Sequence, residues 1–554
     1  MPSEASRALV RIGSNYARLL VTMAMGLALV PLQLEIFGED GFGLISVVTT
    51  SIGLAALLQD VCERSLVREM GAAHHAGDDG AFRAVCDAAW LVALASAAIT
   101  AALFVVVLLC VPWLVDDRPD LVPAAQALVG AEALLGLLSI LILPAQVMYS
   151  VTERFVLYNA FVALQRTGYL VPALLIWWLG PGPGTVEGAP AQGGTLVTYA
   201  LGCVAMHTVT LLIPAGLMLA MDRRLMPRPW RARRAVLRKV VGNFGWNSAV
   251  VFALGSHERT TALIGNLAMA PAGLVWNAVY AVGLRGCAIV RMATYGMTVG
   301  LDAVSTRVTT HHDPAERLRW LVGHASRLHA FTAVPGGITF FMLTEPIIEL
   351  WIGRSLEDPA ATIPQAAVMV RVLIVASVVR SVVDGWIAIL YGAGHIRSVV
   401  RLALAGAVLT PVAALLLLAV LPRDLRLYAP AIAFGAVFTV VHGVVLPPVA
   451  ARRLGVRLSD LWAPMIRPAI VSFACAPIYA GALVLIERWT LLHLIGVLAA
   501  YGAAYALLSW LFVVTPQERS RLIAAARRRL PRGSDPQPPG LDLGATTSST
   551  STGV

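Results

Sequence analysis

The chain is poor in charged residues. Only 13% of its 554 residues are charged, whereas 58% are hydrophobic. A soluble domain is about one-quarter charged and cannot hide that much apolar surface in a single core. Lysine is nearly missing as well, because Lys239 is the only one among the 42 basic residues. This composition excludes an ordinary soluble domain and predicts a chain that is surrounded by lipid.

Other absences exclude classes of site. The six cysteines stand singly without a CxxC pair, and the two adjacent histidine pairs, at 74–75 and 311–312, have no third ligand at a suitable spacing. No loop carries the GK[ST] motif that binds nucleotide phosphates. No polar segment is long enough for a nucleotide-binding domain or a large catalytic loop. We therefore predict no cofactor, no metal site and no nucleic-acid partner, and the chain is not expected to be an enzyme.

Hydrophobic runs are what the sequence has in abundance. Apolar stretches of about 20 residues recur from end to end, each long enough to cross a hydrocarbon core of about 30 Å. They predict an all-α polytopic membrane protein with about 14 transmembrane helices. The predicted spans are 15–36, 42–61, 85–112, 125–148, 156–180, 195–220, 241–267, 272–299, 324–350, 365–391, 398–420, 428–450, 464–486 and 490–514.

The distribution of basic residues predicts the orientation. With the N-terminus in the cytoplasm, 28 Arg and Lys fall in predicted cytoplasmic segments and only five in predicted outside loops. Basic residues favour the cytoplasmic side of membrane proteins. We expect a multi-pass protein of the cell membrane whose N- and C-termini are both cytoplasmic.

Two segments lie outside the spans. The basic stretch 221–240 joins the sixth and seventh spans, and we expect it to contact anionic membrane lipids. Residues 515–554 form a cytoplasmic tail whose last part, after Leu530, lacks any apolar face and is expected to be disordered.

A weak internal repeat predicts two similar halves. GFGLISVVTTSIGL (41–54) and PAGLVWNAVYAVGL (271–284) share two Gly-Leu pairs at an offset of 230 residues. Both copies begin the second span of a six-span half, which predicts a parallel repeat and alternating access between two lobes. The predicted organisation is an N-terminal lobe (1–220), the basic linker (221–240), a C-terminal lobe (241–450) and two extra helices (451–514).

Short motifs resemble one family of transporters. FGEDGFGLISVV (37–48) is similar to its first outside turn, and RTTALIGNLAMAPAGLVWNAVYAV (259–282) to its junction between helices seven and eight. EPIIELWIGR (345–354) resembles the end of its ninth helix, and LYGAGHIRSVVRLAL (390–404) the turn after its tenth. The family is the polysaccharide flippases of the multidrug/oligosaccharidyl-lipid/polysaccharide (MOP) exporter superfamily, and the resemblance extends over residues 10–515.

The resemblance implies a fold and an activity. It implies two six-helix lobes in a MATE-like arrangement around a central cavity, with two extra C-terminal helices. It also implies outward movement of a lipid-linked oligosaccharide, in cooperation with polysaccharide polymerase machinery. The cavity of this family is often cationic, which suits a diphosphate-linked substrate.

Charged residues inside the spans are the candidate site residues. A charge near the membrane midplane costs at least about 2.5–3.5 kcal/mol, so such a residue should face protein or water. The triplet His257–Glu258–Arg259 interrupts an apolar run, and Arg259 either lines the cavity or packs structurally. The predicted substrate-binding residues are Arg259, Arg285, Arg166, Arg291 and Arg18, of which the last two are near enough to the cytoplasmic face to reach it instead.

Acidic residues in the spans are fewer. Arg380 and Asp384 are four residues apart and share one helix face, which predicts a structural ion pair. Asp384, Arg380 and Glu258 are also the candidates for coupling transport to an ion. The excess of deep arginine favours an anionic substrate, because guanidinium groups bind phosphate oxygens in a bidentate way.

The predicted function is therefore a flippase for a polyprenyl-diphosphate-linked oligosaccharide. A peptidoglycan-precursor flippase is an alternative, because its cavity would also be cationic. A drug or cation antiporter of the MATE type should instead concentrate acidic residues. A membrane-embedded glycosyltransferase would need a larger outside loop than the roughly 15 residues predicted for the longest loop of this chain.

Overall fold

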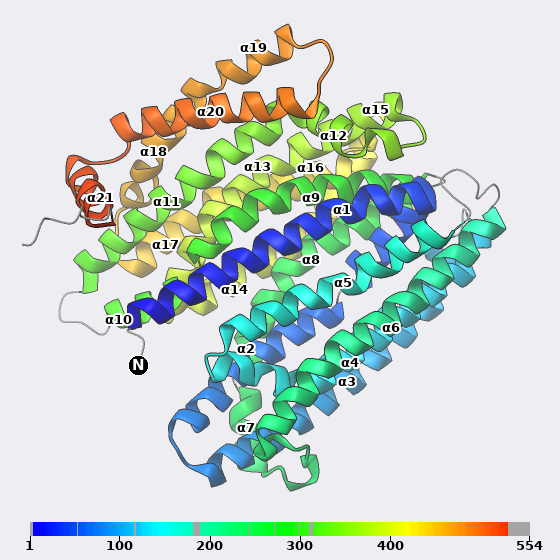
Figure 1. Ribbon diagram of the computed structural model, residues 1–554, viewed down its shortest axis with the longest axis vertical. Helices are drawn as coiled ribbons and strands as arrows, with labels where there is room; N and C mark the ends of the chain where they lie inside the picture. Colours follow the sequence, from blue (N-terminus) through cyan, green and yellow to red (C-terminus); the bar gives the residue numbers. More distant parts are fainter. Residues whose placement is uncertain are drawn as a thin grey trace, which may run out of the picture.

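The chain folds into a bundle of long helices (Figure 1). The computed structural model describes residues 4–52, 54–115, 118–180, 189–242, 244–270, 272–298, 300–309 and 314–529, and these contain no strand. The basic linker lies within the described residues, whereas the part of the tail after residue 529, for which disorder is predicted, lies outside them.

Three sets of helices follow one another along the chain. The first set is α1 (Glu4–Ile52), α2 (Leu54–His75), α3 (Asp79–Leu114), η1 (Pro119–Leu121), α4 (Val122–Val151), α5 (Phe155–Leu179) and α6 (Ala189–Met221), followed by the linker elements η2 (Arg223–Leu225), η3 (Pro229–Arg231) and α7 (Arg234–Gly242). The second set is α8 (Phe244–Ala268), α9 (Gly273–Thr298), α10 (Leu301–Thr309), α11 (Pro314–Met342), α12 (Thr344–Ile352), η4 (Gly353–Ser355), α13 (Pro359–Gly392), α14 (Ile396–Val420), α15 (Arg423–Arg426), α16 (Ala429–Thr439), the π-helical η5 (Val440–Val445) and α17 (Leu446–Leu454). The last set is α18 (Leu458–Cys475), α19 (Pro477–Leu485), α20 (Leu491–Phe512) and α21 (Pro516–Arg529).

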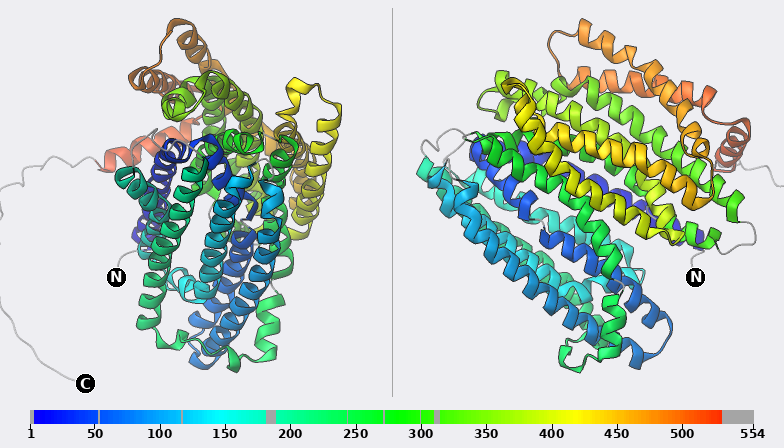
Figure 2. Two further views of the ribbon diagram at one scale, coloured as in Figure 1. Left: turned by 90° about the vertical axis from the view of Figure 1, so that its right-hand side faces the viewer. Right: turned by 180° about the vertical axis from the view of Figure 1, so that it is seen from behind.

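The helices form two groups, which contact each other chiefly through α1 and α9. We call α1–α6 the N-terminal group, in which α4 packs on α3 and α6, and α1 on α5. We call α8–α17 the C-terminal group, in which α13 packs on α9 and α11, and α14 on α8. The helices α18–α20 lie along the outer side of the C-terminal group and contact it through α11 (Figure 2). The predicted lobe boundaries at residues 220, 240 and 450 stay a prediction.

The number of apolar helices is smaller than the fourteen spans expected. Within the described residues, eleven helices are long and apolar enough to cross a membrane, or twelve if α11 and α12, bent by 74°, make one span. The second and seventh predicted spans correspond to the end of α1 with α2, and to α8. Both α2 and α8 carry several charged or polar side chains that are turned toward other helices rather than lipid, such as the buried Glu69 and His257.

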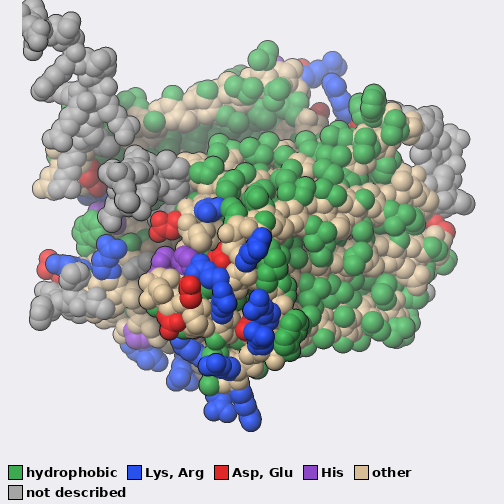
Figure 3. Space-filling model, turned by 60° about the horizontal axis from the view of Figure 1, so that its bottom comes forward, with side chains coloured by type: hydrophobic (Ala, Val, Ile, Leu, Met, Phe, Trp, Pro, Cys, Tyr) green, Lys and Arg blue, Asp and Glu red, His purple; other side chains and the backbone are tan. Residues whose placement is uncertain are grey.

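Side-chain chemistry agrees with a membrane-embedded body. One face of the molecule is a continuous hydrophobic surface, whereas Lys and Arg side chains gather at one end (Figure 3). Leu109, Val420 and Leu485 are among the many large apolar side chains that are exposed. Lipid is the environment in which such a surface is stable. The chain is therefore a multi-pass membrane protein.

The two groups meet tightly at the end of the bundle away from the N-terminus. There α1 kinks at Gly38, whose φ of 67° lies in the left-handed region. A Cβ atom on Gly43 would lie 1.8 Å from the carbonyl oxygen of Leu274, so the two copies of the predicted repeat touch backbone to backbone. Asn266 donates a hydrogen bond of 2.8 Å to the carbonyl of Leu114, which also joins the two groups.

Candidate functional site

The three side chains of the charged triplet on α8, His257, Glu258 and Arg259, point in different directions. Adjacent residues of a helix point about 100° apart, so three in a row cannot share one environment. His257 is buried in the C-terminal group, where its Nδ1 lies 2.7 Å from Oγ1 of Thr410. Glu258 accepts a hydrogen bond of 3.2 Å from Arg291 of α9. The three side chains therefore have different surroundings.

Arg259 is turned toward the N-terminal group. The carboxylates whose charges act on it are Glu258 and Asp60 of α2. Its Nη1 atom is buried and has no hydrogen-bond partner among the described residues. Arg259 thus lies where α8 of the C-terminal group faces α2 of the N-terminal group.

Arg285 and Arg166 converge from opposite groups. Arg285 extends from the middle of α9, and its Nη1 lies 3.5 Å from the position of a Cβ atom on Gly26 of α1. Arg166 of α5 is the charged residue whose repulsion acts most strongly on Arg285, followed by interactions with Tyr199 and Tyr169. Both arginine side chains are exposed although they lie in the middle of long helices. A like-charged pair therefore lies between the two groups, at side chains that the packing leaves partly uncovered.

The two tyrosines that act on Arg285 are hydrogen-bonded to other polar side chains of the N-terminal group. Gln33 donates a hydrogen bond of 2.8 Å to the hydroxyl of Tyr199, and the hydroxyl of Tyr169 donates one of 3.1 Å to Glu132. A single Gln, Glu or Tyr in an apolar run has no distinguishing spacing, so the sequence did not mark these residues. The two tyrosines are marked only by their approach to Arg285.

Arg291 and Arg18 have separate surroundings. Arg291 lies between two carboxylates, because both Glu258 and Asp384 act on its charge. Arg18 lies near Tyr158, whose hydroxyl donates a hydrogen bond of 3.1 Å to Glu63. Within the described part of the chain no hydrogen bond or ion pair joins Arg18 to Arg285.

Arg380 and Asp384 form the ion pair that their spacing predicts. Nε of Arg380 lies 2.6 Å from Oδ1 of Asp384, and its guanidinium stands 5.4 Å from the ring centre of Phe438. Since Asp384 also acts on Arg291, the four charges Glu258, Arg291, Asp384 and Arg380 alternate in sign along one network. The positive and negative charges of this network compensate one another. In the pair Arg166 and Arg285, by contrast, both side chains are positively charged.

A buried histidine lies next to this network. His442 belongs to the π-helical turn η5 and stacks on Phe438, with ring centres 4.2 Å apart. Neither ring nitrogen of His442 has a hydrogen-bond partner within the described residues, and the side chain is 1% exposed. π-helical turns are frequent at functional sites.

Comparison of sequences gives no relative, because no protein-family model and no curated protein matches the chain. Comparison of folds gives several similar solved structures. A structure described as the lipid II flippase MurJ in an inward closed conformation matches with a TM-score of 0.63 and 10% identity, covering 89% of this chain and 97% of that one. An inward-facing multidrug resistance MATE transporter of the MOP superfamily matches with a TM-score of 0.62 and 15% identity, covering 80% of this chain and 98% of that one.

A third match concerns the polarity of the binding pocket. It is a MOP superfamily transporter from Pyrococcus furiosus Vc1 (DSM3638), whose reverse pocket polarity is said to suggest a different function. The TM-score is 0.54 at 13% identity, with 85% of this chain and 96% of that one covered. Likeness at such low identity concerns the fold. The chain thus has the fold of the MOP superfamily transporters, and the all-α, MATE-like architecture expected from its sequence motifs is confirmed.

Proposed function

We propose that the protein is a flippase that moves a polyprenyl-diphosphate-linked oligosaccharide across the cell membrane for the assembly of surface polysaccharide. The support comes from its fold and from the chemistry of the arginines between its two groups of helices, Arg166, Arg285 and Arg259, which we call the interlobe arginines. The fold is shared with proteins that are described as flippases and transporters, not as enzymes.

One observation carries the proposal. Arg166 and Arg285 are exposed and repel each other, and within the described residues neither forms an ion pair with a carboxylate. Two like charges between membrane helices are costly unless an anion joins them. A diphosphate offers several oxygens to two guanidinium forks at once. Arg259, with its buried Nη1 atom, supplies a third cation from the same interface.

Transport would follow by rocking the two groups about this site. If the N-terminus is cytoplasmic, the tight contacts around Gly43 and Leu274 lie on the outer side and close it, so substrate would reach the site from the cytoplasm. Substrate would enter there, bind the arginines, and leave once the contacts on the outer side separate. The network of Glu258, Arg291, Asp384 and Arg380 is the candidate for coupling this movement to an ion.

The test is export in a deletion strain of the source organism. Complementation with the wild-type chain should restore surface polymer, and Arg285→Ala and Arg166→Ala should lower export at least about tenfold at equal protein abundance. Lipid-linked repeat units should accumulate on the cytoplasmic side of the membrane. Arg285→Lys should retain part of the export, because the charge stays while the bidentate fork is lost.

A matched control is Arg371→Ala. Arg371 lies in α13 but pairs with Glu345 at 3.0 Å on the other side of the C-terminal group, so export should remain. Normal export with both Arg285→Ala and Arg166→Ala would contradict the proposed site. Normal surface polymer in the deletion strain itself would contradict the proposed substrate.

The second candidate substrate is a peptidoglycan precursor. The likeness of the fold to a lipid II flippase structure, at a TM-score of 0.63, favours it. The two candidates differ in the phenotype of a strain depleted of its resident lipid II flippase. Restored growth on expression of this chain would favour the peptidoglycan precursor, and continued lysis would favour the oligosaccharide.

A further inference from the structure

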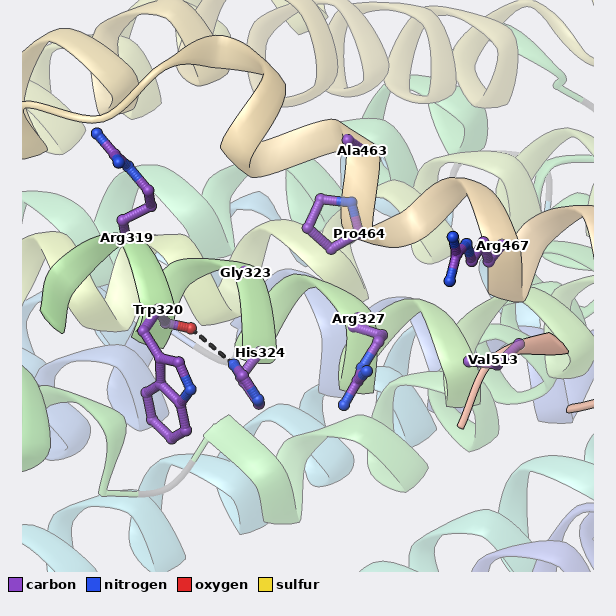
Figure 4. Close-up of a pocket in the computed structure, with 9 residues that line it drawn as sticks. All are labelled: Arg319, Trp320, Gly323, His324, Arg327, Ala463, Pro464, Arg467 and Val513. Atoms are coloured by element: carbon purple, nitrogen blue, oxygen red, sulfur yellow. Dashed lines mark hydrogen bonds between the residues drawn. The ribbon is translucent and has the colours of Figure 1, made fainter. Parts of the chain in front are cut away.

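A basic pocket lies away from the interlobe arginines, between α11, α18 and the end of α20. It has a volume of about 410 Å³ and is lined by Arg319, Trp320, Gly323, His324, Arg327, Ala463, Pro464, Arg467 and Val513. Figure 4 shows Arg467 on α18, opposite the helix α11 that carries Arg319, His324 and Arg327. The two helices meet at its floor, where a Cβ atom on Gly323 would lie 3.6 Å from Cγ of Pro464.

The charges of this pocket do not balance. Arg319 pairs with Asp460 at 3.1 Å, and Arg327 pairs with Glu518 of α21. Arg467 has no ion pair or hydrogen bond within the part of the chain that the structure describes, and its side chain is exposed. The lining therefore retains one uncompensated guanidinium beside two others and an imidazole. Such a lining favours a phosphate group.

The position of Arg467 on α18 indicates where the phosphate comes from. Ile466 and Ile470, on the neighbouring face of the same helix, are 53% and 62% exposed, and Phe473 one turn further is 64% exposed. This apolar strip begins at the mouth of the pocket and continues along the helix. A molecule that carries both a phosphate and long acyl chains matches both surfaces, whereas free phosphate matches only the pocket.

We infer that this pocket binds the headgroup of an anionic phospholipid, with its acyl chains lying along Ile466, Ile470 and Phe473. Arg467 holds the phosphate, and Trp320, which is 61% exposed at the rim, lies at the level of the membrane interface. The bound lipid joins α18 to α11 and so ties the added helices to the C-terminal group. The inference concerns neither the transported substrate nor the interlobe arginines.

Native mass spectrometry of the purified full-length protein tests the inference. The detergent-solubilised protein is titrated with phosphatidylglycerol, or with phosphatidylcholine of the same acyl chains as the zwitterionic probe. We expect retention of phosphatidylglycerol, with affinity lowered about tenfold by Arg467→Gln, because a hydrogen-bonded charge is lost. Arg453→Gln removes the same charge from an exposed site on α17 outside the pocket and should leave the affinity unchanged.

A second variant leaves every charge in place. Ala463 lines the pocket and is exposed, so Ala463→Trp fills the pocket without disturbing buried packing and should also abolish retention. Equal retention in wild type and both pocket variants, or equal retention of phosphatidylcholine, would overturn the inference. Displacement of the lipid by inorganic phosphate at equal concentration would show that the ligand is the free anion, which would overturn it as well.

Discussion

At the scale of single residues, spacing along the chain predicted some contacts and not others. The i,i+4 spacing of Arg380 and Asp384 predicted their ion pair, because one helix turn fixes both side chains on one face. The partner of Glu258 is Arg291, 33 positions away on another helix. No local pattern encodes such a distance. The approach of Arg166 to Arg285 likewise depends on how two groups of helices pack, so the sequence could mark the arginines but not pair them.

A prediction at this scale concerns His442. A buried polar group without a hydrogen bond costs about 1–3 kcal/mol, and an apolar side chain of similar size removes that cost. His442→Leu should therefore raise the free energy of unfolding by about 1 kcal/mol, measured by thermal unfolding of the purified protein in detergent.

The exposed His493 of α20 provides the control for this substitution. His493→Leu changes the same atoms at an exposed site where Nδ1 of the ring already lies 3.2 Å from the carbonyl oxygen of Arg488, so no such gain is expected. A lower unfolding midpoint for His442→Leu would mean that the imidazole makes interactions beyond those of the described residues.

At the scale of helices, hydropathy predicted most of the elements. Nearly every expected span corresponds to a helix, and the exceptions are informative. The helices α2 and α8 are not apolar enough to count as membrane spans, because they carry polar side chains that face the protein interior. In α8, His257 is hydrogen-bonded to Thr410 and Glu258 to Arg291. The bend between α11 and α12 is also absent from any hydropathy pattern.

Contact between α1 and α9 leads to a second prediction. Gly43 faces the backbone of Leu274, which cannot move aside as a flexible side chain would. Gly43→Ala should force the two helices apart and destabilise the protein by about 1–3 kcal/mol. Protein abundance and the midpoint of thermal unfolding should both fall.

Gly130 of α4 is a suitable control for Gly43. A Cβ atom there would meet nothing within 4 Å, so Gly130→Ala should be neutral or stabilise by up to about 1 kcal/mol through helix propensity. Equal behaviour of the two variants would show that α1 and α9 are not in backbone contact.

The docking of α21 should depend on pH. A hydrogen bond from Arg327 lowers the pKa of Glu518 from 4.5 to about 2, assisted by hydrogen bonds from Thr515. A carboxyl whose pKa is lowered on docking stabilises the docked form fully above its ordinary pKa and loses that contribution as the pH falls through its lowered pKa. The amide protection factors of 516–529, which correct for the intrinsic pH dependence of exchange, should therefore be high at pH 7 and fall between about pH 4.5 and 2.

Glu518→Gln mimics the protonated state without a change of pH. At pH 7 it should lower the amide protection factors of 516–529 to the level that wild type shows in acid. Unchanged exchange in this variant would mean that the helix is held by contacts other than the pair of Glu518 and Arg327.

At the scale of the whole molecule, the contacts between the two groups bear on the proposed transport. Glu39, beside the kink of α1, accepts hydrogen bonds of 3.2 Å from the backbone of Glu357 and from the hydroxyl of Thr362. A transporter that alternates access must break these contacts to open this end. The contacts stabilise the form that is closed at this end and not the form that is open there. Each of them therefore contributes to the free-energy difference between the two forms.

Thr362→Val removes one of these hydrogen bonds and nearly preserves the shape of the side chain. A loss of about 1 kcal/mol shifts the ratio of the two states about fivefold toward the form that is open at this end. Spin labels at positions 126 and 360, which are exposed on the two groups near this end, report the change as an increased population of long distances. Thr198→Val removes a hydrogen bond of 3.0 Å within α6 alone and should leave the distances as in wild type. If Thr362→Val also leaves them unchanged, the contacts at Glu39 do not hold this end closed, and the gate between the two groups must lie elsewhere.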